Sequence, residues 1–275
     1  MKFDVYKDTF IWNFFVKNLE KLLFPFIRIK KNHEFFKITE KYSKIISKIS
    51  VLEYDESSAW NEWKRFVNKI IYLSKENKLS SFLLWRPIIT TMNVTNAQFL
   101  NNEYRYLKIH HNWDMFWKDK LIKKNKIDEY RFLKNINYTG NFIHHWYLLE
   151  RFMDFSWVNF SKIWYIYEFW WWYGALSTSI HRLWFSGIYY IYDFKLFSIL
   201  QKYFFELEWL NLSDSVNSKW IYCYSDLNDL NGIDNINWTK LFIATWSISE
   251  APIDIRERYI NILKKYVWKF DYFIL

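Results

Sequence analysis

Basic side chains gather in two segments of the chain and could bind the phosphates of a polyanion. One segment is residues 118–126, and the other lies within the first 50 residues, which hold 11 basic and 5 acidic side chains. Like charges this close together repel one another unless they are solvated or matched by an anion. A solvated helical surface is the alternative for the amino-terminal segment. The candidate ligands for RNA phosphates are Arg28, Lys30, Lys31, Lys118, Lys120, Lys123, Lys124 and Lys126.

The sequence lacks the signatures of common enzymes. Four glycines cannot form a G-x-G-x-x-G turn or a phosphate-binding loop, and neither G-x-S-x-G nor H-E-x-x-H occurs. Cys223 is the one cysteine, which excludes an intrachain disulfide and a zinc site with two thiolates. In the pairs His110/His111 and His144/His145, adjacent side chains point to different sides, so a shared metal ion is not expected. We therefore expect no enzyme, with no catalytic residue, cofactor or metal.

The stretch EFWWWYGALSTS, residues 168–179, indicates a strand that ends and turns into a helix. Gly174 permits a sharp turn because it lacks a Cβ atom, and Thr178 or Ser179 can cap the helix. The tryptophans are expected to pack that helix against the sheet. Aromatic residues make up 24% of the chain, so most of them must fill a core or an interface rather than stack on bases.

Strands and helices alternate from about residue 103 to the end of the sequence. Asn112 and Asn141 are placed to cap two of the helices, and another helix follows Pro252. Such alternation is typical of parallel sheets whose strands are buried on both faces, so we predict a parallel α/β sheet. The expected strands are 103–109, 132–138, 163–167, 240–245 and the closing residues FDYFIL.

Composition divides the chain into segments with different expected roles. Residues 1–90 are charged and carry apolar side chains at helical spacing, which predicts a basic helical extension. Residues 91–275 are expected to form the α/β domain. Because residues 196–236 hold 6 acidic and 2 basic side chains, we expect this part to face protein or solvent rather than phosphate.

The turn at residues 171–179 and the spacing of the elements resemble the S-two family of small-subunit ribosomal proteins. The family motif, Arg-Trp-x-x-Gly-x-Leu-Thr-Asn or commonly Arg-Trp-x-Gly-Gly-x-Leu-Thr-Asn, is matched in its common form by Trp172, Gly174 and Thr178, whereas Trp171 replaces the arginine and Ser179 the asparagine. The segments YLKIHHNW and NINYTG follow one another at an interval similar to the family's, and KLFIAT comes about sixty residues after Thr178. The resemblance covers roughly the last two thirds of the chain.

The resemblance implies a flavodoxin-like, doubly wound parallel sheet with a helical hairpin insertion at about residues 180–236. It also implies a structural constituent of the small ribosomal subunit, at the junction of head and body, in contact with ribosomal RNA and neighbouring ribosomal proteins. Phosphate contacts position such a protein and carry little sequence information. We therefore expect these partners and no small-molecule substrate.

Residue usage indicates a mitochondrial gene. Ile, Lys, Asn, Phe and Tyr abound, as in AT-rich genes, yet 18 tryptophans are present. A genetic code that reads UGA as tryptophan explains both features. We therefore expect a protein encoded in the mitochondrial genome and located on the matrix ribosome. No apolar run in the sequence is long enough to span a bilayer.

Two other functions fit the sequence. The net charge of +9 and the aromatic content would suit a non-catalytic accessory subunit of an inner-membrane respiratory or ATP synthase complex. The third hypothesis is an enzyme on a flavodoxin-like sheet, which a bound nucleotide or flavin would indicate. Sedimentation with small-subunit RNA, or with respiratory enzymes, separates the first two.

Overall fold

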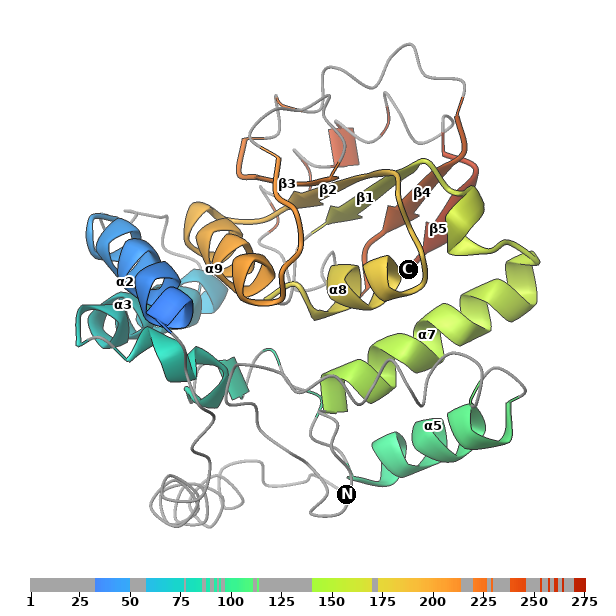
Figure 1. Ribbon diagram of the computed structural model, residues 1–275, viewed down its shortest axis with the longest axis horizontal. Coiled ribbons are helices and arrows are strands. Elements are labelled where there is room, and N and C mark those ends of the chain that lie inside the picture. Colours follow the sequence, from blue (N-terminus) through green and yellow to red (C-terminus); the bar gives the residue numbers. More distant parts are fainter. Residues whose placement is uncertain are drawn as a thin grey trace.

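The computed structural model shows an α/β protein in which helices flank a five-stranded parallel sheet (Figure 1). The prediction of a parallel α/β sheet is therefore confirmed. The strands are β1 (Tyr165–Phe169), β2 (Ile188–Tyr192), β3 (Trp220–Tyr224), β4 (Lys240–Ile243) and β5 (Tyr272–Ile274). The structure describes residues 33–49, 58–76, 78–85, 97–110, 140–169, 173–213, 220–226, 238–245 and 270–275, with single positions between these ranges.

Hydrogen bonding places the strands in the order β3-β2-β1-β4-β5. β1 is the central strand, with Ile166 opposite Tyr189 of β2 and opposite Leu241 of β4. Along the chain, β2 pairs with one side of β1, and β3 pairs with β2. β4 then pairs with the other side of β1, and β5 pairs with β4. The strands expected at 163–167, at 240–245 and at the carboxyl terminus are confirmed as β1, β4 and β5.

Helices cover one face of the sheet. α8 (Ala175–Arg182) and α9 (Lys195–Leu207) lie on this side, and α7 (Gly140–Ser156) lies beside α8 (Figure 1). The ring of His181 in α8 contacts the ring of Tyr189 in β2, with centroids 5.5 Å apart. Between α7 and β1, the chain forms the short 3₁₀ helix η3 (Phe160–Lys162). The buried aliphatic side chains of this face include Ile166, Ile191, Ile221, Leu241 and Ile243.

Aromatic rings line the opposite face of the sheet. Tyr167 stacks on Tyr190 with ring centroids 4.8 Å apart, and Phe169 stacks on Tyr192 at 5.4 Å. Phe270 contacts Tyr167 edge-on, at 5.3 Å. Aromatic pairs of these geometries stabilise a core beyond the area that they bury. These rings account for part of the aromatic content through the core rather than through nucleic acid.

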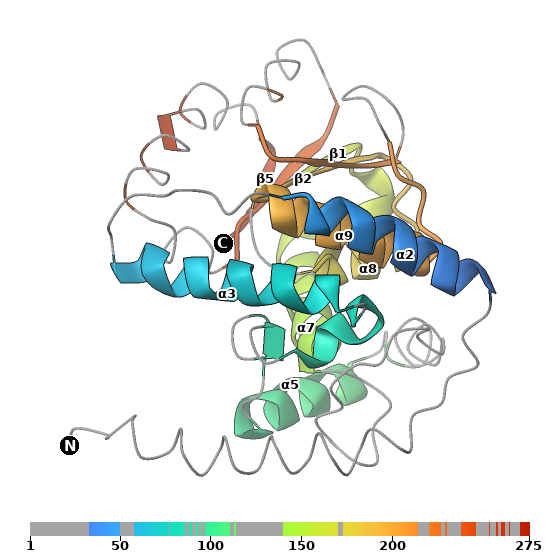
Figure 2. The same cartoon turned by 90° about the vertical axis from the view of Figure 1, so that its left-hand side faces the viewer.

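Two amino-terminal helices lie near α9, one of which packs against α9 and the other against the first (Figure 2). They are α2 (His33–Ser47) and α3 (Ser58–Lys75), followed by the 3₁₀ helix η1 (Leu79–Leu84). The ring of Tyr42 in α2 lies 5.6 Å from that of Tyr203 in α9, and Thr39 shares a 3.0 Å hydrogen bond with the Tyr203 hydroxyl. Buried side chains of α2 therefore belong to the same hydrophobic core as the sheet.

The prediction of a strand at 103–109 is wrong, because these residues belong to the helix α5 (Ala97–Ile109). α5 packs along α7, where Glu103 accepts a 2.7 Å hydrogen bond from Nδ1 of His144. Glu103 and Leu107 are four residues apart and both buried, as on one face of a helix. Partners on α7 thus favour the helical spacing over the alternating aromatic pattern of Tyr104 and Tyr106.

The helical hairpin expected at about 180–236 is also wrong. This range contains two strands, β2 and β3, that pair with each other and with β1 in the parallel sheet. Only α9 lies between them in the described part of this range. The strands IYYIY and WIYCY are aromatic runs with mostly buried side chains, and their backbone groups are satisfied because β2 pairs with β1 and β3 pairs with β2. The strand expected at 132–138 and the helix expected after Asn112 lie outside the described residues.

Candidate functional site

Gly174 is the N-cap residue of α8 and comes five residues after Phe169, where the central strand β1 ends. Gly174 has φ 101° and ψ 13°, a left-handed conformation that residues with a Cβ atom rarely adopt. A Cβ atom at this position would lie 2.4 Å from the ring of Phe205 in α9. Both the backbone conformation and the available space therefore require glycine at this turn.

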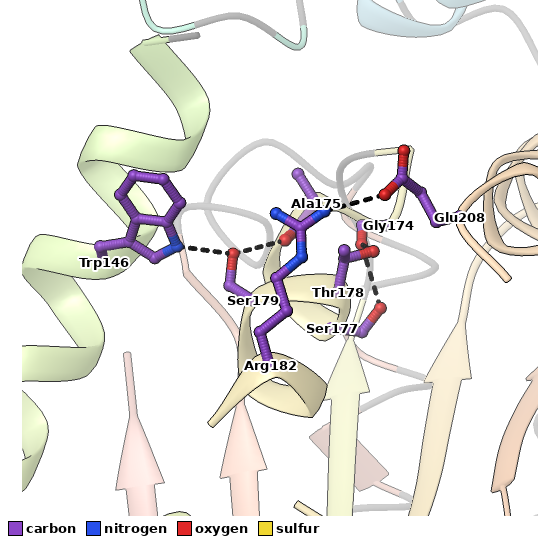
Figure 3. A network of polar contacts seen from close by, with 8 residues as sticks. All are labelled: Trp146, Gly174, Ala175, Ser177, Thr178, Ser179, Arg182 and Glu208. Carbon is purple, nitrogen blue, oxygen red and sulfur yellow. Dashed lines mark hydrogen bonds and ion pairs between the residues drawn. The ribbon is translucent and has the colours of Figure 1, made fainter. Parts of the chain in front are cut away.

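The hydroxyl groups of α8 bond to its own backbone and to α7. Ser177 Oγ and Thr178 Oγ1 both donate to the carbonyl oxygen of Gly174, at 3.1 and 2.9 Å (Figure 3). Ser179 Oγ accepts a 3.1 Å hydrogen bond from Nε1 of Trp146, which ties α8 to α7. The expectation that Thr178 or Ser179 caps α8 is wrong. Both lie inside the helix, where hydroxyls bond the carbonyl four residues earlier, and Gly174 is the N-cap residue.

Asn141 fixes the residue that precedes the glycine turn. Its Nδ2 donates to the Tyr173 hydroxyl at 3.2 Å and to the carbonyl of Met92 at 2.7 Å, and its Oδ1 accepts from the Val94 N–H at 2.8 Å. Asn141 is fully buried, so these bonds satisfy groups that water cannot reach. The expectation that Asn141 caps its helix is wrong, because the side chain bonds to other segments instead.

Asp193 directly follows β2 and lies at the same edge of the sheet as Gly174. Its N–H donates to the carbonyl of Tyr224, which extends the pairing with β3. Its Oδ1 accepts a 2.7 Å hydrogen bond from the Phe194 N–H, and its Oδ2 accepts one of 2.8 Å from Nε2 of Gln201. The side chain is buried, so the two bonds hold the carboxylate in one orientation at the end of β2.

Glu168 is the second carboxyl group near this edge. It lies in β1 on the helix-covered face, and its Oε2 accepts a 2.6 Å hydrogen bond from the Tyr189 hydroxyl. Burial raises the pKa of Glu168 to about 8, and the hydrogen bond from Tyr189 lowers it in part. Burial likewise lowers the pKa of His181, in α8, to about 4. The carboxyl group is therefore mainly protonated, and this imidazole neutral, at pH 7.

The strand order reverses at β1 and β4, and open α/β sheets bind ligands outside the carboxyl ends of the strands at such a point. Gly174 follows β1 here, and Ala244 follows β4. In sheets of this kind an acidic residue about 20 positions after the glycine turn bonds the ribose of a nucleotide. Asp193 has this position. The edge can thus offer backbone N–H groups at the start of α8 and a carboxylate to a ligand with hydroxyl groups.

No known protein-family model, curated protein or solved structure matches this chain. Within the described residues, every helix is too short or too polar to cross a bilayer. The geometry of the site therefore has to carry the functional argument.

The structure places only some of the residues singled out in the sequence. Gly174 and Thr178 lie together at the start of α8, where Thr178 bonds the Gly174 carbonyl. The remaining candidates lie outside the described residues: Trp172, Arg28, Lys30, Lys31, Lys118, Lys120, Lys123, Lys124 and Lys126.

Sequence reasoning missed Asp193 and Glu168. The signal for Asp193 is an acidic residue directly after the buried run IYYIY, about 20 positions after Gly174. Glu168 is a charged residue within an otherwise apolar strand. A carboxyl group there must be buried, so a shifted pKa could have been expected from the strand pattern.

A second polar cluster links α5 to α7. His110 Nδ1 lies 2.7 Å from Oε1 of Glu150, and its Nε2 lies 3.0 Å from Oδ2 of Asp154. The Tyr106 hydroxyl also donates to Asp154, at 2.8 Å. One nitrogen and two carboxylate oxygens within 4.8 Å of one another could hold a metal ion. Each ring nitrogen already lies against a carboxyl oxygen, however, so the direct contacts of His110 with Glu150 and Asp154 account for the geometry.

Proposed function

We propose that this chain is an enzyme that binds a nucleoside cofactor at the carboxyl edge of its sheet. The observation that carries the proposal is the place of Asp193, directly after β2 and beside the glycine turn that follows the central strand. A carboxylate accepts about four hydrogen bonds, so Asp193 can accept from ribose hydroxyls besides Phe194 and Gln201. Because Asp193 is buried, the ligand reaches it only after the surrounding chain moves.

The strand order supports this proposal. The order β3-β2-β1-β4-β5 is that of the first five strands of a doubly wound, Rossmann-like sheet, whereas flavodoxin-like sheets have the order 2-1-3-4-5. We propose the Rossmann-like form. Proteins with this form bind dinucleotides and nucleosides where the strand order reverses, between the first and fourth strands. These strands are β1 and β4 here.

The charges at this edge favour a nucleoside without phosphate groups. Its described residues include the acidic side chains Asp193 and Asp226 and one basic side chain, Lys195, whereas the buried Glu168 is mainly protonated at pH 7. Pyrophosphate sites usually add arginine or lysine to the helix N-terminus. A cationic nucleoside such as S-adenosylmethionine suits this edge better. The reaction would move a methyl group from the sulfonium sulfur to an oxygen or nitrogen nucleophile. The nucleophile would lose a proton, and the cofactor would become S-adenosylhomocysteine.

Calorimetric titration of the protein from its own cells tests the function. We expect S-adenosylhomocysteine to bind with a micromolar dissociation constant, and NAD and ATP to bind at least tenfold more weakly. D193N should weaken binding at least tenfold, with its melting temperature measured to confirm that the variant is folded, whereas D226N, a change at an exposed acid of the same edge, should leave binding unchanged. If NAD or ATP binds more tightly than S-adenosylhomocysteine, the proposed cofactor is wrong. If none of the three binds, the proposed function is refuted.

The ribosomal role is the second candidate function. It is favoured by the net charge of +9 and by the glycine turn at Gly174, with β4 at a spacing similar to that of the S-two family. Its partners would be small-subunit ribosomal RNA and neighbouring ribosomal proteins in mitochondria. Co-sedimentation with the small subunit after mild detergent lysis tests this role. Migration of the protein apart from ribosomal RNA would remove it.

A further inference from the structure

Four tryptophans have a backbone conformation that normally belongs to glycine. Among the described residues, every non-glycine residue with positive φ is a tryptophan: Trp157 (60°), Trp184 (61°), Trp209 (60°) and Trp220 (109°). A bulky residue in this region is a genuine outlier. We propose that the gene encodes these four residues with UGA, and that the cell which makes the protein translates this codon as glycine.

Three of the four lie where helices end. Trp157 directly follows α7, and Trp184 and Trp209 follow the C-cap residues of α8 and α9. Helices commonly end with one left-handed residue at this position, and it is usually glycine. The end of α9 shows the complete pattern: the Leu210 N–H bonds the carbonyl of Phe205 at 3.0 Å, and the Trp209 N–H bonds that of Glu206 at 3.3 Å.

The side chains at these positions are not needed in the core. Trp157, Trp184 and Trp209 are 91%, 58% and 59% exposed. Trp146, in contrast, is 2% exposed, has ordinary φ, and donates its indole N–H to Ser179. The described tryptophans thus include a buried indole with ordinary φ, Trp146, and exposed indoles on a left-handed backbone at 157, 184 and 209. A single codon for tryptophan does not explain this division, but two codons with different meanings do.

Composition supports the same conclusion. Glycine normally makes up about 7% of residues, or about 19 in a chain of this length, whereas this chain has 4 glycines and 18 tryptophans. The expected mitochondrial origin depends on UGA being translated as tryptophan. Glycine at UGA would account for the excess of one residue and the shortage of the other at once, and it would remove the argument for a mitochondrial gene.

One consequence bears on the proposed cofactor site. If the tryptophans at 170–172 are also UGA-encoded, the sequence after β1 becomes Gly-Gly-Gly-Tyr-Gly-Ala-Leu-Ser. Glycines directly after the first strand are the usual means by which a backbone approaches a nucleotide. The decoding can be correct even if no cofactor binds, because it depends on the backbone at Trp157, Trp184, Trp209 and Trp220.

Peptide mass spectrometry of the protein from its own cells, with the gene sequenced in parallel, tests the decoding. We expect UGA and glycine at positions 157, 184, 209 and 220, and UGG and tryptophan at 146. Tryptophan at the four positions would overturn the proposal and support the mitochondrial code. Neither result depends on cofactor binding, so failure of the cofactor proposal remains distinguishable.

A recombinant chain with tryptophan throughout gives a second test. W157G, W184G and W209G should each raise the melting temperature, because glycine adopts left-handed φ without a steric penalty. W209A is the matched control: it removes the same exposed indole but keeps a Cβ atom, so it should not reach the melting temperature of W209G. W146G should lower the melting temperature. Equal melting temperatures for W209G and W209A, or a fall in all three glycine variants, would contradict the proposal.

Discussion

The Tyr189 hydroxyl donates a 2.6 Å hydrogen bond to Oε2 of Glu168, across two adjacent parallel strands and beneath α8. Burial raises the pKa of this carboxyl group to about 8. The central strand of the sheet therefore carries an acid that is mainly neutral at pH 7, one residue before the strand ends. The stability of the fold must depend on its protonation.

The free energy of unfolding should fall as pH rises towards 8. The folded-state pKa of Glu168, about 8, lies above its ordinary value of 4.5, so the folded state binds the extra proton between these values and stability is lost as pH rises through them. His181, with a pKa of about 4, stays neutral from pH 6.5 to 8. Urea unfolding in this window should show a decrease of about 1 kcal/mol per pH unit. An E168Q variant with the same slope as the parent would contradict this assignment.

Gly174→Ala should destabilise the protein by about 3 kcal/mol, since it combines a left-handed alanine with a close contact. The new Cβ atom would lie 2.4 Å from the Phe205 ring. Chemical denaturation measures the loss. Adding F205L to G174A should recover only the steric part, because the φ of 101° remains. A G174A protein as stable as the parent would show that the turn is not built as described.

Glu103 and His144 should be energetically coupled by about 1–3 kcal/mol. They are buried, 2.7 Å apart, and lie on α5 and α7. A double-mutant cycle with E103A and H144A measures the coupling, and the exposed pair Glu40 and Lys44 serves as a control with a far smaller value. Additive effects of E103A and H144A would mean that α5 does not pair with α7 in this register.

Parts of the fold can be predicted from the sequence because their signals are local. The runs at 163–167 and 240–245 are apolar over the length of a strand, and they form β1 and β4. The turn at Gly174 is likewise visible, since a glycine lies between an apolar strand and small polar residues. These signals need no knowledge of distant partners.

Other parts depend on partners that a sequence does not name. In residues 103–106 polar and aromatic side chains alternate, yet this segment belongs to a helix in which Glu103 contacts His144 of α7 and Leu107 is buried. The strand at 188–192 reads as a strand in isolation, but the resemblance to a ribosomal family assigned its range to a helical hairpin. Asp193 gains significance only when β2 is recognised as a strand beside β1. Because β2 was not predicted as a strand, the site at Asp193 was not predicted either.

The central claim is that a nucleoside cofactor binds at the carboxyl edge of β1 and β2, and hydrogen–deuterium exchange tests it most directly. Exchange should be measured on the native protein with and without saturating S-adenosylhomocysteine. We expect slower exchange in peptides that contain residues 173–176 and 192–195, and unchanged exchange at the opposite edge, in peptides covering 162–165 and 186–188. Protection confined to the opposite edge, or no protection at either edge, would contradict the claim.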